Sequence, residues 1–201
     1  MLRVGLTGGL ASGKSFAGQA LADLGCYLIE ADQLGHQVLL PDGEAYPGVI
    51  RDFGRDILDR EGFIDRKKLG ALVFANRDLL QKLNRLVHRP VQEREERMIS
   101  EIVQHDRHAI IVVAAAILVE TGSYKRFDRL IVVTCTLEQQ IERAMKRGPF
   151  SREEVLARLA QQLPLSEKVR VADYVIDTSG TKEKTLEQAR EVYKSLRSLS
   201  V

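Results

Sequence analysis

The sequence has little of three things that would indicate a disulfide framework, a membrane span or nucleic-acid binding. It contains only two cysteines, Cys26 and Cys135, and no C-x-x-C or histidine spacing, which favours two buried free thiols over a disulfide or metal site. The longest apolar run, residues 109–119, is too short to cross a bilayer. The 30 basic and 28 acidic residues nearly balance, so the composition shows no basic excess that would indicate nucleic-acid binding.

The first residues and the chain length predict a simple organisation. Met1 to Arg3 lead directly into a predicted strand, so we expect no signal peptide and a cytoplasmic protein without membrane contact. A chain of 201 residues is long enough for one well-packed domain with small insertions.

A glycine-rich segment near the N-terminus carries the strongest motif. It reads Gly8-Gly9-Leu10-Ala11-Ser12-Gly13-Lys14-Ser15, which matches G-x-x-x-x-G-K-[ST]. The apolar run 2–6 before it predicts a buried strand, and the apolar spacing over 14–24 after it predicts a helix. This is the strand–loop–helix context of a phosphate-binding P-loop, so the sequence predicts a nucleoside triphosphate site. The alternative is a chance glycine turn with Ser12 as an N-cap.

Each part of this loop has an expected task. Backbone N–H groups must surround a triphosphate, and Gly8, Gly9 and Gly13 are expected to supply backbone angles open mainly to glycine. The helix beginning near Lys14 directs free N–H groups and a positive dipole end at the phosphates. We expect Lys14 to reach the β- and γ-phosphates and the Ser15 hydroxyl to hold Mg²⁺.

The remaining periodicities predict an α/β fold. Further strands are expected over 26–29, 109–119, 129–134 and 174–177, which completes a five-stranded parallel sheet. Helical patterns are expected over 33–40, 45–53, 66–74 and 77–105, and Pro90 should interrupt or kink the last one. We interpret residues 33–107 as a helical insertion that covers the substrate within a single domain, 1–201.

Residues 145–170 are predicted to act as a short helical lid. Capping-box spacing starts one helix at Thr136 and a second at Ser151, which is expected to run to about residue 163. On the first helix, Arg143 and Arg147 are four residues apart and therefore share a face. They are expected to neutralise charge on the transferred phosphoryl group, or else to form weak surface pairs with glutamates 142 or 154.

Two carboxylates are expected at strand ends, where open α/β sheets place their chemistry. Asp32 follows the second strand; it serves this chemistry, caps the next helix at residue 33, or does both. Glu120 follows the third predicted strand, and the alternatives for it are an N-cap or a surface charge. A closing amphipathic helix is expected over 185–199.

Four basic side chains lie close together in the sequence of the predicted insertion: Arg85, His88, Arg89 and Arg94. They form either a solvated helix face or an anion clamp, which a P-loop protein with a covering subdomain needs.

Absent motifs narrow the protein class. The sequence has no N-K-x-D segment for reading guanine, and it is too short for a large motor ATPase. Five strands, a helical insertion and a short lid instead favour a small-molecule kinase, in which mobile parts close over both substrates and exclude water.

The order of the motifs resembles the dephospho-CoA kinase family over nearly the whole chain. The residues that carry the resemblance are 5–15, Leu24-Gly25, 29–32, Phe53-Gly54, 62–66 with Leu69, Val73-Phe74, His88, 118–120, Gln140, Arg143, Arg147, Gln162 and 172–176. The resemblance implies a P-loop kinase fold and ATP-dependent phosphorylation of the ribose 3′-hydroxyl of dephospho-CoA, giving coenzyme A and ADP. It also implies Mg²⁺ with ATP as co-substrate.

The resemblance implies roles for individual residues as well. Asp32, Lys14 and Arg143 would be catalytic, with Asp32 orienting or deprotonating the hydroxyl; Asp32, His88 and Glu120 would bind the acceptor. ATP would be bound by Gly8, Gly9, Leu10, Ala11, Ser12, Gly13, Lys14, Ser15, Phe16, Arg143 and Arg147, with Ser15 as the metal ligand. The implied partners are ATP and dephospho-CoA, without nucleic acid or membrane, and the expected assembly is a monomer or weak homo-oligomer.

Four positions depart from the family pattern. Glu30 stands where an aspartate is usual, and Ala116 replaces a proline. Thr178-Ser179-Gly180 lacks the asparagine usually found before the glycine, so no adenine contact is assigned there. Arg89 separates His88 from Pro90, a pair that is usually adjacent.

Two rival functions stay open. One is a different small-molecule or nucleotide kinase, because the fold does not determine the acceptor. The other is a nucleotide-binding regulatory module without chemistry, against which the intact Lys14, Ser15 and Asp32 argue.

Overall fold

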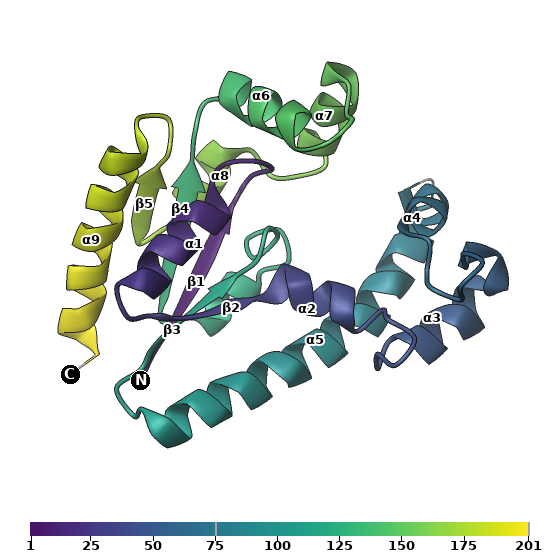
Figure 1. Ribbon diagram of the computed structural model, residues 1–201, viewed down its shortest axis with the longest axis horizontal. Coiled ribbons are helices and arrows are strands. Elements are labelled where there is room, and N and C mark those ends of the chain that lie inside the picture. Colours follow the sequence, from purple (N-terminus) through teal and green to yellow (C-terminus); the bar gives the residue numbers. More distant parts are fainter. Residues whose placement is uncertain (75, 201) are drawn as a thin grey trace. The chain divides into compact units, whose positions relative to one another are not determined.

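The computed structural model describes residues 1–74 and 76–200, which fall into two compact units. The first, here called the α/β unit, comprises Met1–Glu30 together with the described part of Glu101–Val201. The second, the helical unit, comprises Ala31–Ser100. Figure 1 labels the elements of both units.

A five-stranded parallel sheet forms the centre of the α/β unit, in the order β2-β3-β1-β4-β5 (Figure 1). Its strands are β1 (Leu2–Gly8), β2 (Tyr27–Glu30), β3 (Ile110–Ala114), β4 (Arg129–Thr134) and β5 (Tyr174–Asp177). In the middle strand, Leu6 is paired with Ala114 of β3 on one side and with Ile131 of β4 on the other. The predicted five-stranded parallel sheet is confirmed.

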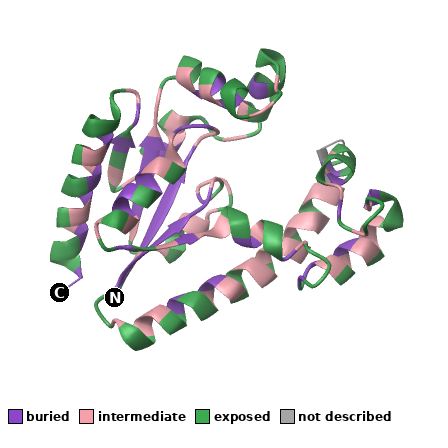
Figure 2. Ribbon diagram, in the orientation of Figure 1, coloured by how far each residue is buried: buried purple, intermediate pink, exposed green. Residues whose placement is uncertain are grey.

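One face of the sheet shares an apolar core with α1 (Lys14–Asp23) and α9 (Lys182–Leu199). Successive side chains of a strand point to opposite faces, and Leu2, Val4 and Leu6 are the β1 residues on this side. Figure 2 shows buried strands beside an α9 whose outer side is exposed. Each large apolar side chain buried here contributes about 1.5–3 kcal/mol.

The third strand is shorter than predicted, because the apolar run outlasts the sheet. Pairing ends at Ala114, and turn hydrogen bonds such as Gly122 N–H to Val119 O at 3.0 Å follow. Leu118 is buried in this turn, which explains why the run stays apolar. Glu120 was predicted to lie at a strand end, and this prediction is wrong because the residue lies in the turn. The short helix η2 (Ser123–Arg126) then leads to β4.

Local signals place most helix ends. Gly25, with φ of +109°, follows the last turn of α1, as a glycine beyond a helix end should. Both predicted capping boxes are present, Thr136 with Gln139 before α6 (Leu137–Arg147) and Ser151 with Glu154 before α7 (Arg152–Leu159). Thr181 caps α9, so that helix begins before the predicted residue 185.

The second lid helix was predicted too long. α7 ends at Leu159, and a separate helix that the sequence pattern did not indicate, α8 (Leu165–Val169), follows Pro164. Proline lacks an N–H and restricts the residue before it, which separates the two helices.

The helical unit consists of α2 (Ala31–Gln37), α3 (Tyr46–Phe53), η1 (Arg55–Ile57), α4 (Arg66–Phe74) and most of α5 (Arg77–His105). Its core joins Val49, Ile57, Leu69 and Val73 to leucines of α5. α5 continues through Pro90, so the predicted interruption is absent, and the alternative of a kink stays a prediction. The missing backbone hydrogen bond is offset because leucines earlier in the helix pack into this core.

α2 begins two residues earlier than predicted. It starts at Ala31, so Asp32 lies inside its first turn and is not its N-cap. A carboxylate in a first turn interacts favourably with the positive end of the helix dipole.

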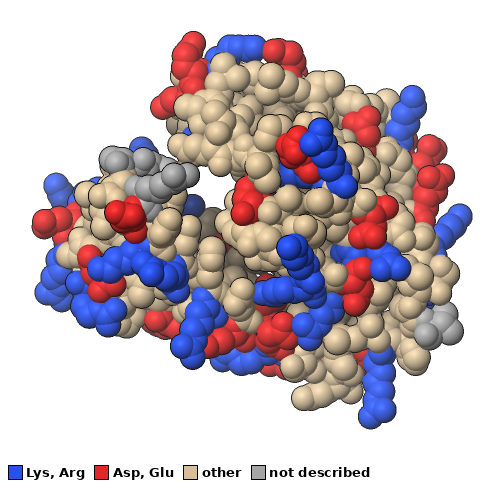
Figure 3. Space-filling view, turned by 180° about the vertical axis from the view of Figure 1, so that it is seen from behind, with Lys and Arg blue, Asp and Glu red and all other residues tan. Residues whose placement is uncertain are grey.

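No helix in the described residues is both long enough and apolar enough to cross a membrane. Basic and acidic side chains are interspersed on the face shown in Figure 3, in keeping with the balanced composition.

Candidate active site

The P-loop connects β1 to α1, and its glycines act differently from one another. Gly13 has φ of +92°, which requires a glycine-like residue, whereas Ala11 takes the other positive φ, +55°. Gly8 is needed for space instead, because a Cβ there would lie 2.5 Å from Ser12 Oγ and 2.7 Å from the Val133 carbonyl oxygen. A Cβ on Gly9 would collide with the Gln140 amide. The prediction that all three glycines supply special backbone angles is correct only for Gly13.

The helix after the loop begins as the motif requires. Lys14 is the first residue of α1 and is half-buried, Ser15 is exposed, and Phe16 is half-buried. The N-cap position is Gly13, without a side-chain cap, so Ser12 does not cap the helix. The first-turn N–H groups therefore point from the end of α1 without a capping side chain, the arrangement that binds anions.

Three side chains from distant segments hold the backbone of the loop. The Leu10 N–H donates to Gln162 Oε1 at 2.8 Å, and the Leu10 carbonyl oxygen accepts from Gln140 Nε2 at 2.7 Å. The Thr178 hydroxyl donates to the Ser12 carbonyl oxygen at 2.7 Å. In the sequence, Gln140 and Gln162 are part of the family resemblance only, and no task is predicted for them.

Helices α6 and α7, which the sequence predicts to form a lid, pack on the loop as well as on each other. Leu10 and Ala11 belong to a cluster with Ile141, Ala144 and Val155 of α6 and α7. Between the helices, Arg152 forms a two-point contact with Glu138, with Nη2 to Oε1 at 2.7 Å and Nη1 to Oε2 at 3.0 Å. Arg158 of α7 folds back on the residues before this helix, where its guanidinium lies 4.2 Å from the Phe150 ring centroid.

The predicted lid arginines differ in their surroundings. Arg143 is half-buried and donates to Thr178 through Nη1 to Oγ1 at 2.9 Å and through Nη2 to the carbonyl oxygen at 2.7 Å. Arg147 is exposed and has no hydrogen-bond or ion-pair partner among the described residues. Surface pairing is wrong for both, because Glu142 pairs with Lys146 and the Glu154 side chain accepts from the Ser151 N–H.

Glu120 lies in a largely buried ion pair that the sequence pattern did not indicate. Lys168 of α8 is fully buried, and its Nζ lies 2.7 Å from Glu120 Oε1 and 2.8 Å from the Ala116 carbonyl oxygen. Glu120 Oε1 also accepts from the Leu163 N–H at 3.1 Å, whereas Oε2 is buried without a hydrogen-bond partner in the described structure. No periodicity in the short stretch around Lys168 signals its burial.

Asp32 and His88 belong to the helical unit. Asp32 is exposed, in the first turn of α2. Burial and the nearby Arg66 charge lower the pKa of His36, and the negative charge of Asp32 acts in the opposite direction. His88 lies within α5, and burial lowers its pKa, which favours a neutral imidazole.

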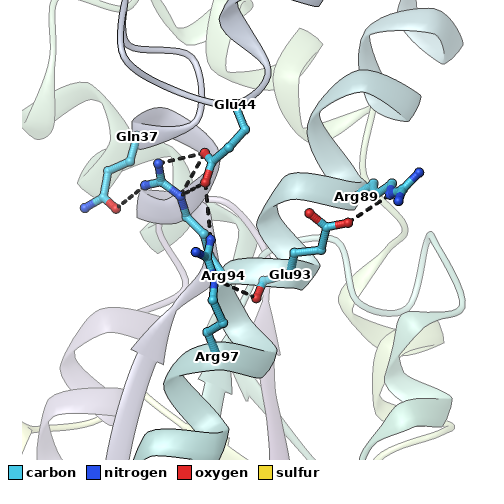
Figure 4. Close-up of polar contacts among 6 residues, drawn as sticks. All are labelled: Gln37, Glu44, Arg89, Glu93, Arg94 and Arg97. Atoms are coloured by element: carbon cyan, nitrogen blue, oxygen red, sulfur yellow. Dashed lines mark hydrogen bonds and ion pairs between the residues drawn. The ribbon is translucent and has the colours of Figure 1, made fainter.

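The basic cluster of the predicted insertion is already paired in part (Figure 4). Arg94 contacts Glu44, with Nη2 to Oε2 at 2.7 Å, and donates to Gln37 at 3.2 Å. The hydrogen bond from Arg94 holds the pKa of Glu44 down at about 2. Arg89 pairs with Glu93 on the exposed side of α5. Arg94 is already paired with Glu44 of the same chain, which argues against its part in the predicted anion clamp.

The two cysteines are free thiols, as predicted. Burial raises the pKa of Cys26 to about 12. Cys135 directly follows β4 and is half-buried, and burial is the main cause of its raised pKa. The described part of the chain contains no cluster of three or more side chains that could hold a metal ion, so neither cysteine belongs to one.

Comparison with known proteins identifies the family. The model of the dephospho-CoA kinase family matches residues 2–184. The chain belongs to the dephospho-CoA kinase family. A dephospho-CoA kinase of Aquifex aeolicus is 41% identical over 98% of this chain and 98% of its own length. One of Carboxydothermus hydrogenoformans is 43% identical over 92% of this chain and 89% of its own length.

Solved structures agree with this fold. A Thermus thermophilus protein is similar with a TM-score of 0.82 and 28% identity, covering 96% of both chains. A dephospho-CoA kinase from Campylobacter jejuni is similar with a TM-score of 0.71 and 24% identity, covering 99% of this chain and 98% of its own. The fold of these solved structures is thus shared over nearly the whole chain.

Proposed function

We propose that this protein transfers the γ-phosphoryl group of ATP to the ribose 3′-hydroxyl of dephospho-CoA, giving coenzyme A and ADP. In this reaction a bond forms between the 3′-oxygen and the γ-phosphorus while the bond from that phosphorus to the bridging oxygen of ADP breaks. The observation that carries the proposal is the family match over residues 2–184 in a chain whose P-loop is complete.

The chemistry needs positioned charges more than covalent participation by the protein. The N–H groups at the start of α1 and the Lys14 ammonium would bind the β- and γ-phosphates. Arg143 and Arg147 would add positive charge from the lid, where charge spreads over the oxygens of the transferred group. Asp32 would orient the 3′-hydroxyl and accept its proton.

Mg²⁺ fits the side chains that are present. It is held in such sites by substrate phosphates, waters and only one or two protein oxygens, so a protein cage is not required. The exposed Ser15 hydroxyl at the start of α1 would supply one such oxygen. When bound with ATP, the ion neutralises charge that develops on the phosphate oxygens.

Acceptor binding by His88 and Glu120 stays a prediction. For His88 the lowered pKa supports a neutral ring that donates one hydrogen bond and accepts another. For Glu120 the contacts to Lys168 and Leu163 engage Oε1, and only the buried Oε2 lacks a partner in the described structure. An acceptor contact there requires the turn around Glu120 to open.

An ADP-release assay with ATP and Mg²⁺ tests the function. Dephospho-CoA, AMP, CMP, shikimate and a no-acceptor control are compared, and phosphorus NMR locates the new phosphate. We expect strong turnover with dephospho-CoA alone and a product phosphorylated on the 3′-oxygen. Turnover with another acceptor would move the substrate assignment, and tight ATP binding without any turnover would support a regulatory module instead.

A further inference from the structure

One hydroxyl group connects three parts of the α/β unit at Thr178, the residue directly after β5. Its Oγ1 lies 2.7 Å from the Ser12 carbonyl oxygen of the P-loop and 2.9 Å from Nη1 of Arg143 in α6. A second Arg143 nitrogen, Nη2, donates to the Thr178 carbonyl oxygen at 2.7 Å. Only 5% of Thr178 is exposed, so these contacts form away from solvent.

The chemistry of the groups determines the direction of each hydrogen bond. A guanidinium only donates, so Arg143 must donate to Oγ1. The single hydroxyl proton is then left for a carbonyl oxygen, and the Ser12 oxygen at 2.7 Å is nearer than the Thr134 oxygen at 3.2 Å. The Thr178 hydroxyl therefore accepts from the lid helix and donates to the phosphate-binding loop.

Thr178 is itself held firmly. Its N–H donates to the Thr134 carbonyl oxygen at 2.9 Å, which keeps it in register with β4. Its side chain lies against the loop, because a Cβ added to Gly13 would come within 2.9 Å of both Oγ1 and Cγ2. A β-branched side chain also has few χ1 options, so the hydroxyl has a defined direction.

We infer that Thr178 is a positioning residue that sets where the Arg143 guanidinium lies relative to the phosphate-binding loop. The inference rests on the proposed role of Arg143 in binding ATP phosphates. A guanidinium carries five N–H donors in a rigid fork, and Thr178 engages two of them, which leaves the others for phosphate oxygens. Without the hydroxyl, the guanidinium keeps one anchor and can rotate about it.

Two substitutions separate positioning from packing. Thr178→Val preserves the shape of the side chain and removes the hydroxyl, whereas Thr178→Ser keeps the hydroxyl and removes the methyl group. If Thr178 only packs, the serine variant should be the weaker one, because it leaves a cavity beside Gly13. If Thr178 positions Arg143, the order reverses. We expect kcat with ATP and dephospho-CoA to fall about tenfold in Thr178→Val and to stay within about twofold in Thr178→Ser.

The same two substitutions are then made in an Arg143→Ala background. Because Thr178 acts through Arg143, Thr178→Val should cause no further loss of kcat there beyond about twofold. A full additional tenfold loss would show that Thr178 acts by another route. Equal turnover of Thr178→Val and wild type, or a serine variant weaker than the valine variant, would also overturn the inference. Thermal unfolding of each variant establishes that it is folded.

Failure of the proposed function gives a different result. If the wild-type protein does not turn over dephospho-CoA, ATP affinity of the same variants is measured by titration with a fluorescent ATP analogue. Positioning of Arg143 then predicts weaker binding in Thr178→Val than in Thr178→Ser, and equal binding by the two would overturn the inference without reference to the acceptor.

Discussion

At the scale of single residues, the P-loop shows that one residue type serves different physical needs. Gly13 is required by its positive φ, whereas Gly8 is required because the Val133 carbonyl oxygen leaves no room for a Cβ. Ala11 takes a positive φ despite its methyl group, which costs of order 1 kcal/mol and persists because α6 and α7 pack on it.

Asp32→Asn should separate catalysis from nucleotide binding. The amide cannot accept the proton of the acceptor hydroxyl, so we expect kcat to fall by about 10²–10⁴-fold while ATP affinity stays unchanged. Steady-state kinetics and an ATP titration measure the two quantities. Glu30→Gln, a change of the other acid in the same Glu-Ala-Asp segment, is the matched control and should lose much less. Similar losses in both variants would contradict the role given to Asp32.

At the scale of elements, the segment from α7 to α8 is attached to the P-loop and to the turn after β3 at successive points. Gln162 binds the Leu10 N–H, the Leu163 N–H binds Glu120, and Lys168 pairs with Glu120. These contacts fix the α8 end of the predicted lid, residues 145–170, within the α/β unit.

Removing one partner of the Lys168–Glu120 pair should lower the stability of the protein more than replacing both partners. Lys168→Met leaves the largely buried Glu120 carboxylate, 17% exposed, without its cation, so we expect the free energy of unfolding to fall by about 3 kcal/mol. Urea unfolding measures it. Adding Glu120→Gln to Lys168→Met removes the uncompensated charge and should recover part of the loss. Strictly additive losses in the double variant would show that the two side chains do not interact energetically.

At the scale of the whole molecule, the two units should respond differently to pH. In the α/β unit, burial raises the pKa of Cys26 to about 12, so its contribution to stability is present below the ordinary thiol value and is lost as pH rises. In the helical unit, burial lowers the pKa of His88, so stability falls as pH drops below the ordinary histidine value.

Glu44 adds a second acid-sensitive group to the helical unit. Its pKa is lowered to about 2 by Arg94, so its contribution is complete above the ordinary value of 4.5 and is lost as pH falls toward 2. The side chain is 40% exposed, so solvent screening limits this contribution to below about 1 kcal/mol. We expect the stability difference between wild type and Glu44→Gln, from urea unfolding, to shrink between pH 7 and pH 2.5.

Glu93→Gln is the matched control for this measurement. Its exposed pair with Arg89 lies on the same helix as Arg94, with 85% of the arginine side chain in solvent. Its stability difference from wild type should change less with pH than that of Glu44→Gln. An equal pH dependence of the two variants would mean that the Glu44–Arg94 contact does not contribute.

Patterns local in the sequence determined the P-loop, the five strands, both capping boxes and the run of helices between β2 and β3. These features follow from periodicity and from contacts between residues a few positions apart, and the predictions for them are confirmed. Where only an apolar run was available, the end of β3 was predicted too late, because burial in a turn and burial in a strand select the same side chains.

Only the tertiary structure decided which polar side chains meet. Thr178 and Ser12, Gln162 and Leu10, and Lys168 and Glu120 are brought together by the order of strands in the sheet and by the path of the chain after α7. A hydroxyl or an ammonium has the same local pattern whether it is solvated or buried. Its partner depends on contacts between residues that are far apart in the sequence, and short-range sequence patterns do not encode such contacts.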